Sequence, residues 1–265
     1  GHHGKTIDEN RRRTRIPLDA GFTGDPAPPG LLSFENVRTN LPAFDQAAAG
    51  QAAINAPPDG DGILRRVPLA VMIGGRPTPT LALEMLRVAS NAEDYRLETR
   101  NGRLVSITTG KRRIPTDAGG ALRLHFSPPL ATRSVSAAAI LDNELPMDAF
   151  RGNVVFIGAT ALGIDDVIAT PVVAESFGVD VHAQLAETVL AGRWLQRPHW
   201  ARTAEILFAL CLGLIAVLIL PLLRPGYVIL TATAAILVLA ASSFTIFAGL
   251  GLLLDPLAPA MVGGA

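Results

Sequence analysis

Two long stretches without a charged residue dominate the C-terminal part of the chain. They comprise residues 206–223 and 225–254, and only Arg224 separates them. Because the apolar core of a bilayer is about 30 Å thick, a helix needs about 20 apolar residues to span it. The pattern predicts transmembrane helices over residues 203–223 and 227–250, and residues 251–265 are expected to begin a third helix, which is truncated.

Before residue 203, apolar and polar positions alternate over shorter distances. Helical spacing occurs in residues 80–89, 136–141 and 179–190, and strand patterns occur in residues 63–73, 104–107, 112–115 and 121–126. Residues 153–157 include four consecutive large apolar side chains, which predicts a strand buried on both faces. We therefore expect an α/β domain over residues 53–200, with a mixed, largely parallel sheet and covering helices. A partly irregular N-terminal stretch, residues 1–52, precedes it.

The distribution of charged residues along the chain excludes some classes of function. The chain has 23 basic and 23 acidic residues, and all except Arg224, Glu205 and Asp255 precede Thr203. The soluble part is therefore close to neutral and lacks the excess positive charge that nucleic-acid binding requires. The single cysteine, Cys211, lies in the first apolar stretch, so a disulfide framework or a cysteine-based metal site is excluded from the soluble part. We expect no metal and no cofactor in this chain.

Two loops share part of the pattern of catalytic or nucleotide-binding motifs. Residues 158–163 follow the predicted buried strand, where a phosphate loop would lie, but they lack the required Gly-Lys-Ser/Thr ending and the three spaced glycines. Residues 174–178 are similar to the nucleophile elbow of hydrolases around Ser176, yet the acidic and histidine partners downstream are too close in sequence. A tight strand exit and a non-catalytic serine are the favoured interpretations, and we expect no catalytic residue.

Two further groups allow both a structural and a functional interpretation. Asp165 and Asp166, together with His182, could form a metal pocket. We favour the alternative in which Asp166 fixes its loop and His182 makes a hydrogen bond at a helix start. The adjacent Arg65 and Arg66 could bind an anion, but a solvated strand edge is the favoured interpretation.

The order and spacing of several motifs resemble the CHASE sensors of the second type, extracellular sensory domains associated with cyclases and histidine kinases. The pattern D-x-D-G-x-x-R-R-x-P-L of that family matches residues 59–69, and G-K-I-V-x-I-G-A-T-A is similar to residues 152–161. The motifs D-x-x-x-T-P, G-V-x-x-H-A and the exit into the membrane match residues 166–171, 178–183 and 192–198.

The chain departs from the family pattern at its beginning. Family members usually start with a membrane helix and a strand that carries an acidic V-x-I-D-x-x-S motif, and neither is found here. We therefore expect an N-terminally truncated sensory domain followed by transmembrane α-helices.

The resemblance implies a multi-pass protein of the bacterial inner membrane with a periplasmic sensor. In the family, three helices connect the sensor to a cytoplasmic output domain, most often an adenylate or guanylate cyclase. A histidine or Ser/Thr kinase is the alternative output. Arg224 between the first two helices favours a cytoplasmic turn, whereas Arg193, Arg197 and Arg202 on the sensor side oppose that orientation. Because a large domain crosses the membrane regardless of its charge, we expect the sensor on the extracytoplasmic side.

The expected partners are the lipid bilayer, an unknown extracytoplasmic ligand and, through the parent protein, a second copy. Six residues are the candidates for ligand binding or signal coupling: Arg65, Arg66, Asp166, Thr170, Pro171 and His182. A membrane-tethered extracytoplasmic hydrolase and an architectural membrane module without a ligand remain the alternatives.

Overall fold

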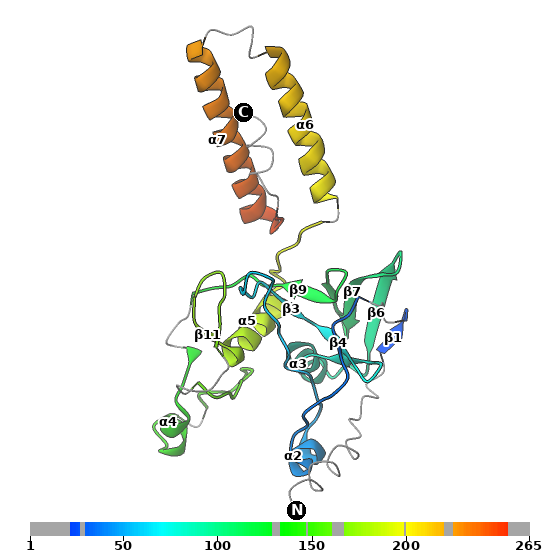
Figure 1. Cartoon of the computed structure of the whole chain (residues 1–265). Coiled ribbons are helices and arrows are strands. Elements are labelled where there is room, and N and C mark those ends of the chain that lie inside the picture. Colours follow the sequence, from blue (N-terminus) through cyan, green and yellow to red (C-terminus); the bar gives the residue numbers. More distant parts are fainter. Residues whose placement is uncertain are drawn as a thin grey trace, which may run out of the picture. The chain divides into compact units, whose positions relative to one another are not determined.

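The computed structural model describes residues 22–26, 30–128, 133–146, 148–160, 167–198, 200–219 and 225–253. The chain divides into two compact units, Gly1–Gly192 and Arg193–Ala265. Within these described ranges, the first unit contains four small sheets and the helices that pack on them, and the second contains two long helices (Figure 1). The mixed α/β character expected from the sequence is confirmed.

The largest sheet has the strand order β1-β6-β7-β8. Its strands are β1 (Phe22–Gly24), β6 (Tyr95–Arg100), β7 (Arg103–Thr109) and β8 (Arg112–Pro115). β6, β7 and β8 form an antiparallel meander, and β1 joins β6 in parallel. The β6–β7 turn is formed by Asn101 and Gly102, both with positive φ, 54° and 71°. This is the conformation that two-residue hairpins favour, because its twist matches that of the strands.

Three smaller sheets complete the first unit. One has the order β2-β4-β5 and the other two are the pairs β3-β9 and β10-β11. Their strands are β2 (Ser33–Phe34), β3 (Arg66–Pro68), β4 (Ala70–Ile73), β5 (Arg76–Pro79), β9 (Ala121–Arg123), β10 (Val167–Ile168) and β11 (Ser176–Phe177). Among the described strand pairs only β1–β6 and β2–β4 are parallel, so a largely parallel sheet is not confirmed.

The described helices of the first unit are α2 (Pro42–Ala47), α3 (Leu81–Ala89), α4 (Ala137–Leu141) and α5 (Gly178–Ala191). Three of these four helices agree with the predicted ones, and α2 was not predicted. α5 ends at Gly192, whose φ of 66° lies in the left-handed region, as expected of a helix stop. Thr80 occupies the N-cap position of α3 without capping it, because its hydroxyl donates to the carbonyls of Pro68 and Leu69 instead.

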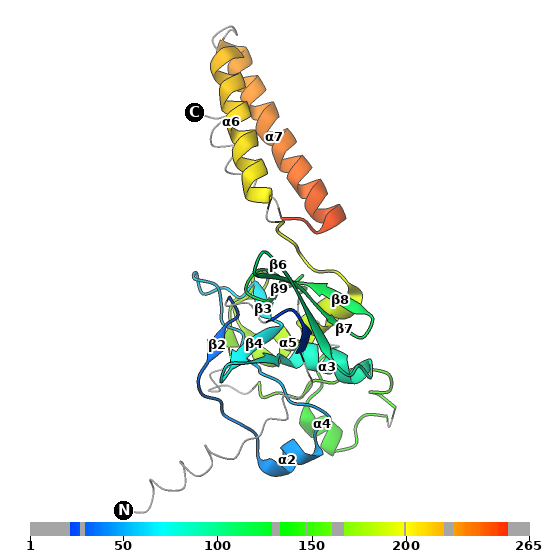
Figure 2. The same cartoon turned by 90° about the vertical axis from the view of Figure 1, so that its right-hand side faces the viewer.

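The core lies between α3, α5 and the strands. α3 packs against α5 and against β7 (Figure 2). The largest fully buried side chains are Leu64, Val67, Leu69, Val71, Leu83, Tyr95, Leu104, Ile107, Ile114, Leu122, Leu124 and Leu185. The alternation predicted for residues 121–126 is seen in Leu122 and Leu124, which are buried, while Arg123 between them is partly exposed.

The prediction of a central strand at residues 153–157 is wrong. These residues have no regular secondary structure, and Val154, Val155 and Ile157 are exposed, Ile157 to 95%. A strand buried on both faces needs a hydrogen-bonded neighbour on each edge, and no described residue pairs with this segment. The segment instead adjoins α5, since a Cβ on Gly158 would lie 2.5 Å from Cβ of Val179.

The second unit contains α6 (Ala201–Ile219) and α7 (Pro225–Leu250). One helix segment among the described residues, Leu230–Gly249, is long and apolar enough to cross a membrane. Its 20 residues correspond to about 30 Å of helix, the thickness of a bilayer core. The predicted third helix lies almost wholly outside the described residues, as does Arg224.

A short backbone bridge joins Gln196, in the linker before α6, to the residues after α7. The N–H of Gln196 donates to the carbonyl of Gly251 (2.9 Å), and the N–H of Leu253 donates to the carbonyl of Gln196 (2.8 Å). Arg197 also forms an ion pair with Glu205 in α6 (2.8 Å). The linker before α6 and the residues after α7 are therefore held together by direct contacts.

Candidate functional site

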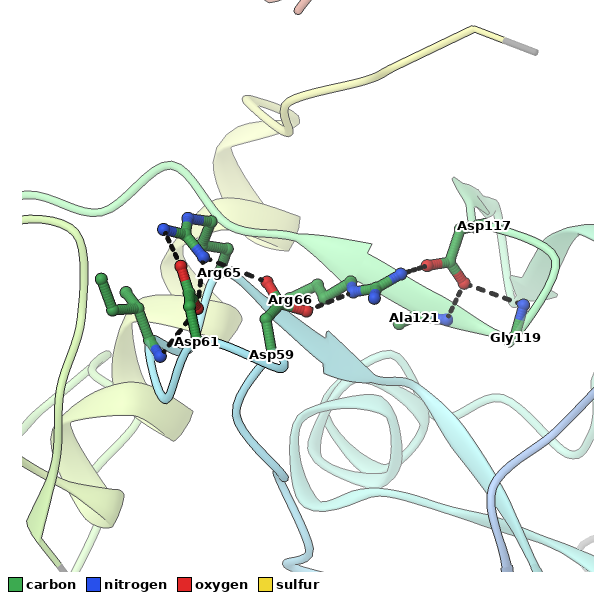
Figure 3. Close-up of polar contacts among 8 residues, drawn as sticks. Asp59, Asp61, Arg65, Arg66, Asp117, Gly119 and Ala121 are labelled. Atoms are coloured by element: carbon green, nitrogen blue, oxygen red, sulfur yellow. Dashed lines mark hydrogen bonds and ion pairs between the residues drawn. The ribbon is translucent and has the colours of Figure 1, made fainter.

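The two adjacent arginines of the predicted site lie in a cluster of ion pairs at β3 (Figure 3). Both Nη atoms of Arg65 donate to the two carboxylate oxygens of Asp61, at 2.9 and 2.8 Å. Arg66 donates from Nε to Asp59 (2.7 Å) and from Nη1 to Asp117 (3.0 Å). Arg65 also approaches Asp59 to 3.6 Å. Three carboxylates therefore surround two guanidinium groups.

A tight turn before β3 positions two of these carboxylates. The N–H of Gly62 donates to the carbonyl of Asp59 (2.8 Å), and the N–H of Ile63 donates to the Asp61 carboxylate (3.1 Å). These bonds turn the chain back, so that both acidic side chains face the arginines that follow. The spacing D-x-D-G-x-x-R-R thus encodes a local fold of the chain.

The third carboxylate comes from the turn before β9. Oδ1 of Asp117 accepts the N–H groups of Gly119 and Ala121, each at 2.9 Å, and its Oδ2 accepts Arg66. Arg66 therefore connects the turn before β3 with the turn before β9. This contact joins two parts of the chain that are 51 residues apart and lies beside the paired strands β3 and β9.

The electrostatic state of the cluster follows from these contacts. The bidentate hydrogen bonds from Arg65, helped by the N–H of Ile63, lower the pKa of Asp61 to about 2. The Asp59 carboxylate, with a smaller effect of Asp117, raises the pKa of Arg66. Arg65 and Arg66 are both engaged by protein carboxylates. Arg66 lies in β3 and is exposed, while Arg65 precedes the strand and is partly exposed.

Thr170 follows a residue that is hydrogen-bonded to the segment carrying this cluster. Its hydroxyl donates to the carbonyl of Val173 (3.0 Å) and accepts the N–H of the same residue (3.1 Å), which closes a turn around the exposed Pro171. The preceding residue, Ala169, accepts the N–H of Leu64 (2.8 Å), directly before Arg65. Asp166 lies outside the described residues.

His182 lies in the N-terminal part of a helix, as the sequence pattern indicates. It lies in α5, is 5% exposed, and its Nε2 is 3.2 Å from the carbonyl oxygen of Ile54. A carbonyl only accepts, so Nε2 carries the proton of this hydrogen bond. This contact links α5 to a segment 128 residues away. No group of three potential metal ligands is found in the described part of the chain.

The loop and serine of the two partial motifs can also be placed. Residues 158–160 are irregular, and residues 161–163 lie outside the described ranges. Ser176 is 8% exposed and forms part of β11, where it pairs with Ile168. A hydrolase nucleophile must be open to its substrate, so this burial argues against a catalytic role for Ser176.

Two polar features were not predicted. Glu84 of α3 is buried, accepts the hydroxyl of Tyr95, and forms an ion pair with Arg87 (2.7 Å). The three-residue spacing of Glu84 and Arg87 could have revealed half of this network. Arg112 of β8 donates to the carbonyls of Val189 (3.2 Å) and Leu190 (3.1 Å) at the end of α5. No short-range pattern in the sequence predicts this contact, because its partners are 77 and 78 residues apart.

The comparisons with known proteins gave one match. A family model described as the CHASE2 domain matches residues 7–218 of the chain. The matched range includes the ion-pair cluster, α5 and nearly all of α6. No curated protein and no solved structure matches.

Proposed function

Since this chain belongs to the CHASE2 domain family, we propose that it detects an extracytoplasmic signal and passes it through α6 and α7 to a cytoplasmic output domain. CHASE2 domains are extracellular sensory domains of signalling receptors, so the general role of the chain is sensory. The family match over residues 7–218 is the observation that carries the proposal.

A membrane location is supported by the second unit. Leu230–Gly249 could cross a bilayer, and large apolar side chains are exposed along both helices. They include Leu210, Leu214, Val217, Leu218, Leu230, Leu237, Val238 and Phe244. Exposure of so much apolar surface to water is unfavourable by about 25 cal/mol per Å², whereas lipid accommodates it. We propose that α6 crosses the membrane as well, which makes the protein multi-pass.

The path of the signal begins at the end of α5. Arg112 connects β8 with the last carbonyls of α5, and a cation there also interacts favourably with the helix dipole. A change of packing in the β6–β7–β8 meander is therefore transferred to the residues that precede Gly192. Beyond Gly192 the chain leads directly into the linker before α6.

The resemblance to the CHASE sensors of cyclases supports an adenylate or guanylate cyclase as the output of the parent protein. A histidine or Ser/Thr kinase is the alternative. In this proposal the chain has no enzymatic activity of its own and binds no cofactor, and the parent protein acts as a homodimer. Cyclic nucleotide production and histidine autophosphorylation, measured on a receptor that contains this chain, distinguish the two outputs.

Membrane topology tests the proposal most directly. In a Cys211→Ser background, the exposed Ser134 and Tyr227 are replaced one at a time by cysteine. A membrane-impermeant maleimide should label Ser134→Cys in intact cells, and should label Tyr227→Cys only after permeabilisation. Labelling of Tyr227→Cys in intact cells, or protection of Ser134→Cys, would contradict the proposed arrangement.

A further inference from the structure

Two arginines stand directly opposite each other in the β3–β9 ladder. Arg66 of β3 and Arg123 of β9 are register partners, while their neighbours Val67 and Leu122 are paired and buried on the other face. Side chains of directly opposed residues lie on the same face of a sheet and within contact distance. Like charges in this arrangement destabilise the pair. The fold therefore maintains an unfavourable juxtaposition at this point.

The two arginines differ in their partners. Arg66 is held by Asp59 and Asp117, but Arg123 forms neither an ion pair nor a hydrogen bond with any described residue. Burial is the main cause that lowers the pKa of Arg123, and the charges of Arg66 and Arg65 lower it further. A guanidinium has five N–H donors, and the intermediate exposure of Arg123 leaves part of this fork accessible from outside.

We propose that Arg123, assisted by Arg66, binds a small oxyanion through a phosphate or carboxylate group. The planar fork of a guanidinium matches both groups, and a second positive charge on the same face adds to the attraction. The bound oxyanion would offset the repulsion between the two arginines and supply the acceptors that Arg123 lacks within the described protein.

The neighbouring carboxylates define the character of this site. Asp59 and Asp117 act on Arg123 in the opposite direction from Arg65 and Arg66, so the carboxylates offset part of the positive charge. Affinity therefore comes mainly from the donors of Arg123, and the charge of Arg66 adds to it. This inference deepens the proposed sensory function and rests on it, because it names the chemical class of the ligand.

The test measures binding of inorganic phosphate to the full chain in nanodiscs of zwitterionic lipid. Equilibrium dialysis with radiolabelled phosphate should show one saturable site per chain, and thermal unfolding should shift upward with phosphate concentration. A hundredfold excess over the dissociation constant stabilises the folded state by about 2.7 kcal/mol. Arg123→Gln should abolish both effects, whereas Arg76→Gln should preserve them, because Arg76 is an exposed strand arginine outside the cluster.

Further arms identify the source of the oxyanion and the role of Arg66. Malonate in place of phosphate tests the carboxylate form. If a lipid phosphate occupies the site, nanodiscs that contain phosphatidylglycerol should suppress the binding of free phosphate. Arg66→Gln should weaken binding, because it removes one positive charge and releases two carboxylates. Circular dichroism of each variant checks that it is folded.

Absence of any oxyanion binding to the folded wild-type chain in either type of nanodisc would overturn the site. Equal binding by folded Arg123→Gln would overturn it as well. Neither result affects the cysteine-labelling test of topology, so failure of the binding site and failure of the proposed function can be told apart.

Discussion

Replacement of Tyr95 by phenylalanine removes a single hydroxyl from the buried contact between β6 and α3. The hydroxyl donates to Glu84, and the side chain of Tyr95 is fully buried. The aromatic ring, which stacks on Phe22 with centroids 4.9 Å apart, remains in the variant. The substitution therefore isolates one hydrogen bond from the packing around it.

The expected loss follows from the charge of the acceptor. A hydrogen bond to a charged group contributes about 1.5–3 kcal/mol. Glu84 keeps its ion pair with Arg87 at 2.7 Å in the variant, so its carboxylate is not left unpaired. We expect the free energy of unfolding to fall by about 2 kcal/mol, which is roughly a 30-fold change in the ratio of folded to unfolded molecules.

Urea unfolding of the full chain in detergent, followed by far-ultraviolet circular dichroism, measures this loss. With a slope of about 2 kcal/mol per molar urea, the midpoint of the sensor transition should fall by about 1 M. Tyr227→Phe is the matched control, because Tyr227 is the only other tyrosine and its side chain is exposed. A decrease of less than about 0.5 kcal/mol for Tyr95→Phe would refute the assigned role of the hydroxyl.

Three further predictions concern other parts of the first unit. Ile157→Ala should change the free energy of unfolding by less than about 0.5 kcal/mol, because Ile157 is exposed. Ile107→Ala, in the core, should lower it by about 2–5 kcal/mol. Similar losses in both variants would show that residues 153–157 are buried after all. The pKa of Asp61 is about 2, below its ordinary 3.8, so its ion pair stabilises the fold above about pH 4, and this contribution disappears as the pH falls towards 2. Asp61→Asn should therefore reduce the dependence of stability on pH in that window, and an unchanged acid unfolding curve would contradict the assignment. Arg112→Ala should speed amide hydrogen exchange in the last turn of α5 without affecting α3, as measured by mass spectrometry, and unchanged exchange at the end of α5 would show that Arg112 does not hold it.

Local signals in the sequence predicted local structure well. Gly192 ends α5 because the left-handed conformation of a helix stop favours glycine, and residues 80–89 form α3 as their spacing indicates. The run at residues 153–157 shows the limit of such signals. A row of large apolar side chains indicates a preference for burial, but whether a strand forms depends on neighbours that lie elsewhere in the chain.

The same distinction applies to the candidate site. The contact between Asp61 and Arg65 spans four residues, and its motif is visible in the sequence. Asp117 reaches Arg66 across 51 residues, and His182 reaches Ile54 across 128. Tertiary folding decides these partners, so no spacing rule could have identified them. The opposition of Arg66 and Arg123 likewise exists only once β3 and β9 are paired.

The backbone bridge between Gln196 and residues 251–253 has a mechanical consequence for the two long helices. Two hydrogen bonds hold Gln196, in the linker before α6, against the residues after α7. Moving this linker away from the end of α7 would break both bonds, at a cost of about 1 kcal/mol each. A displacement of the linker therefore acts on α6 and on the end of α7 at the same time, so the two helices are expected to move together rather than independently.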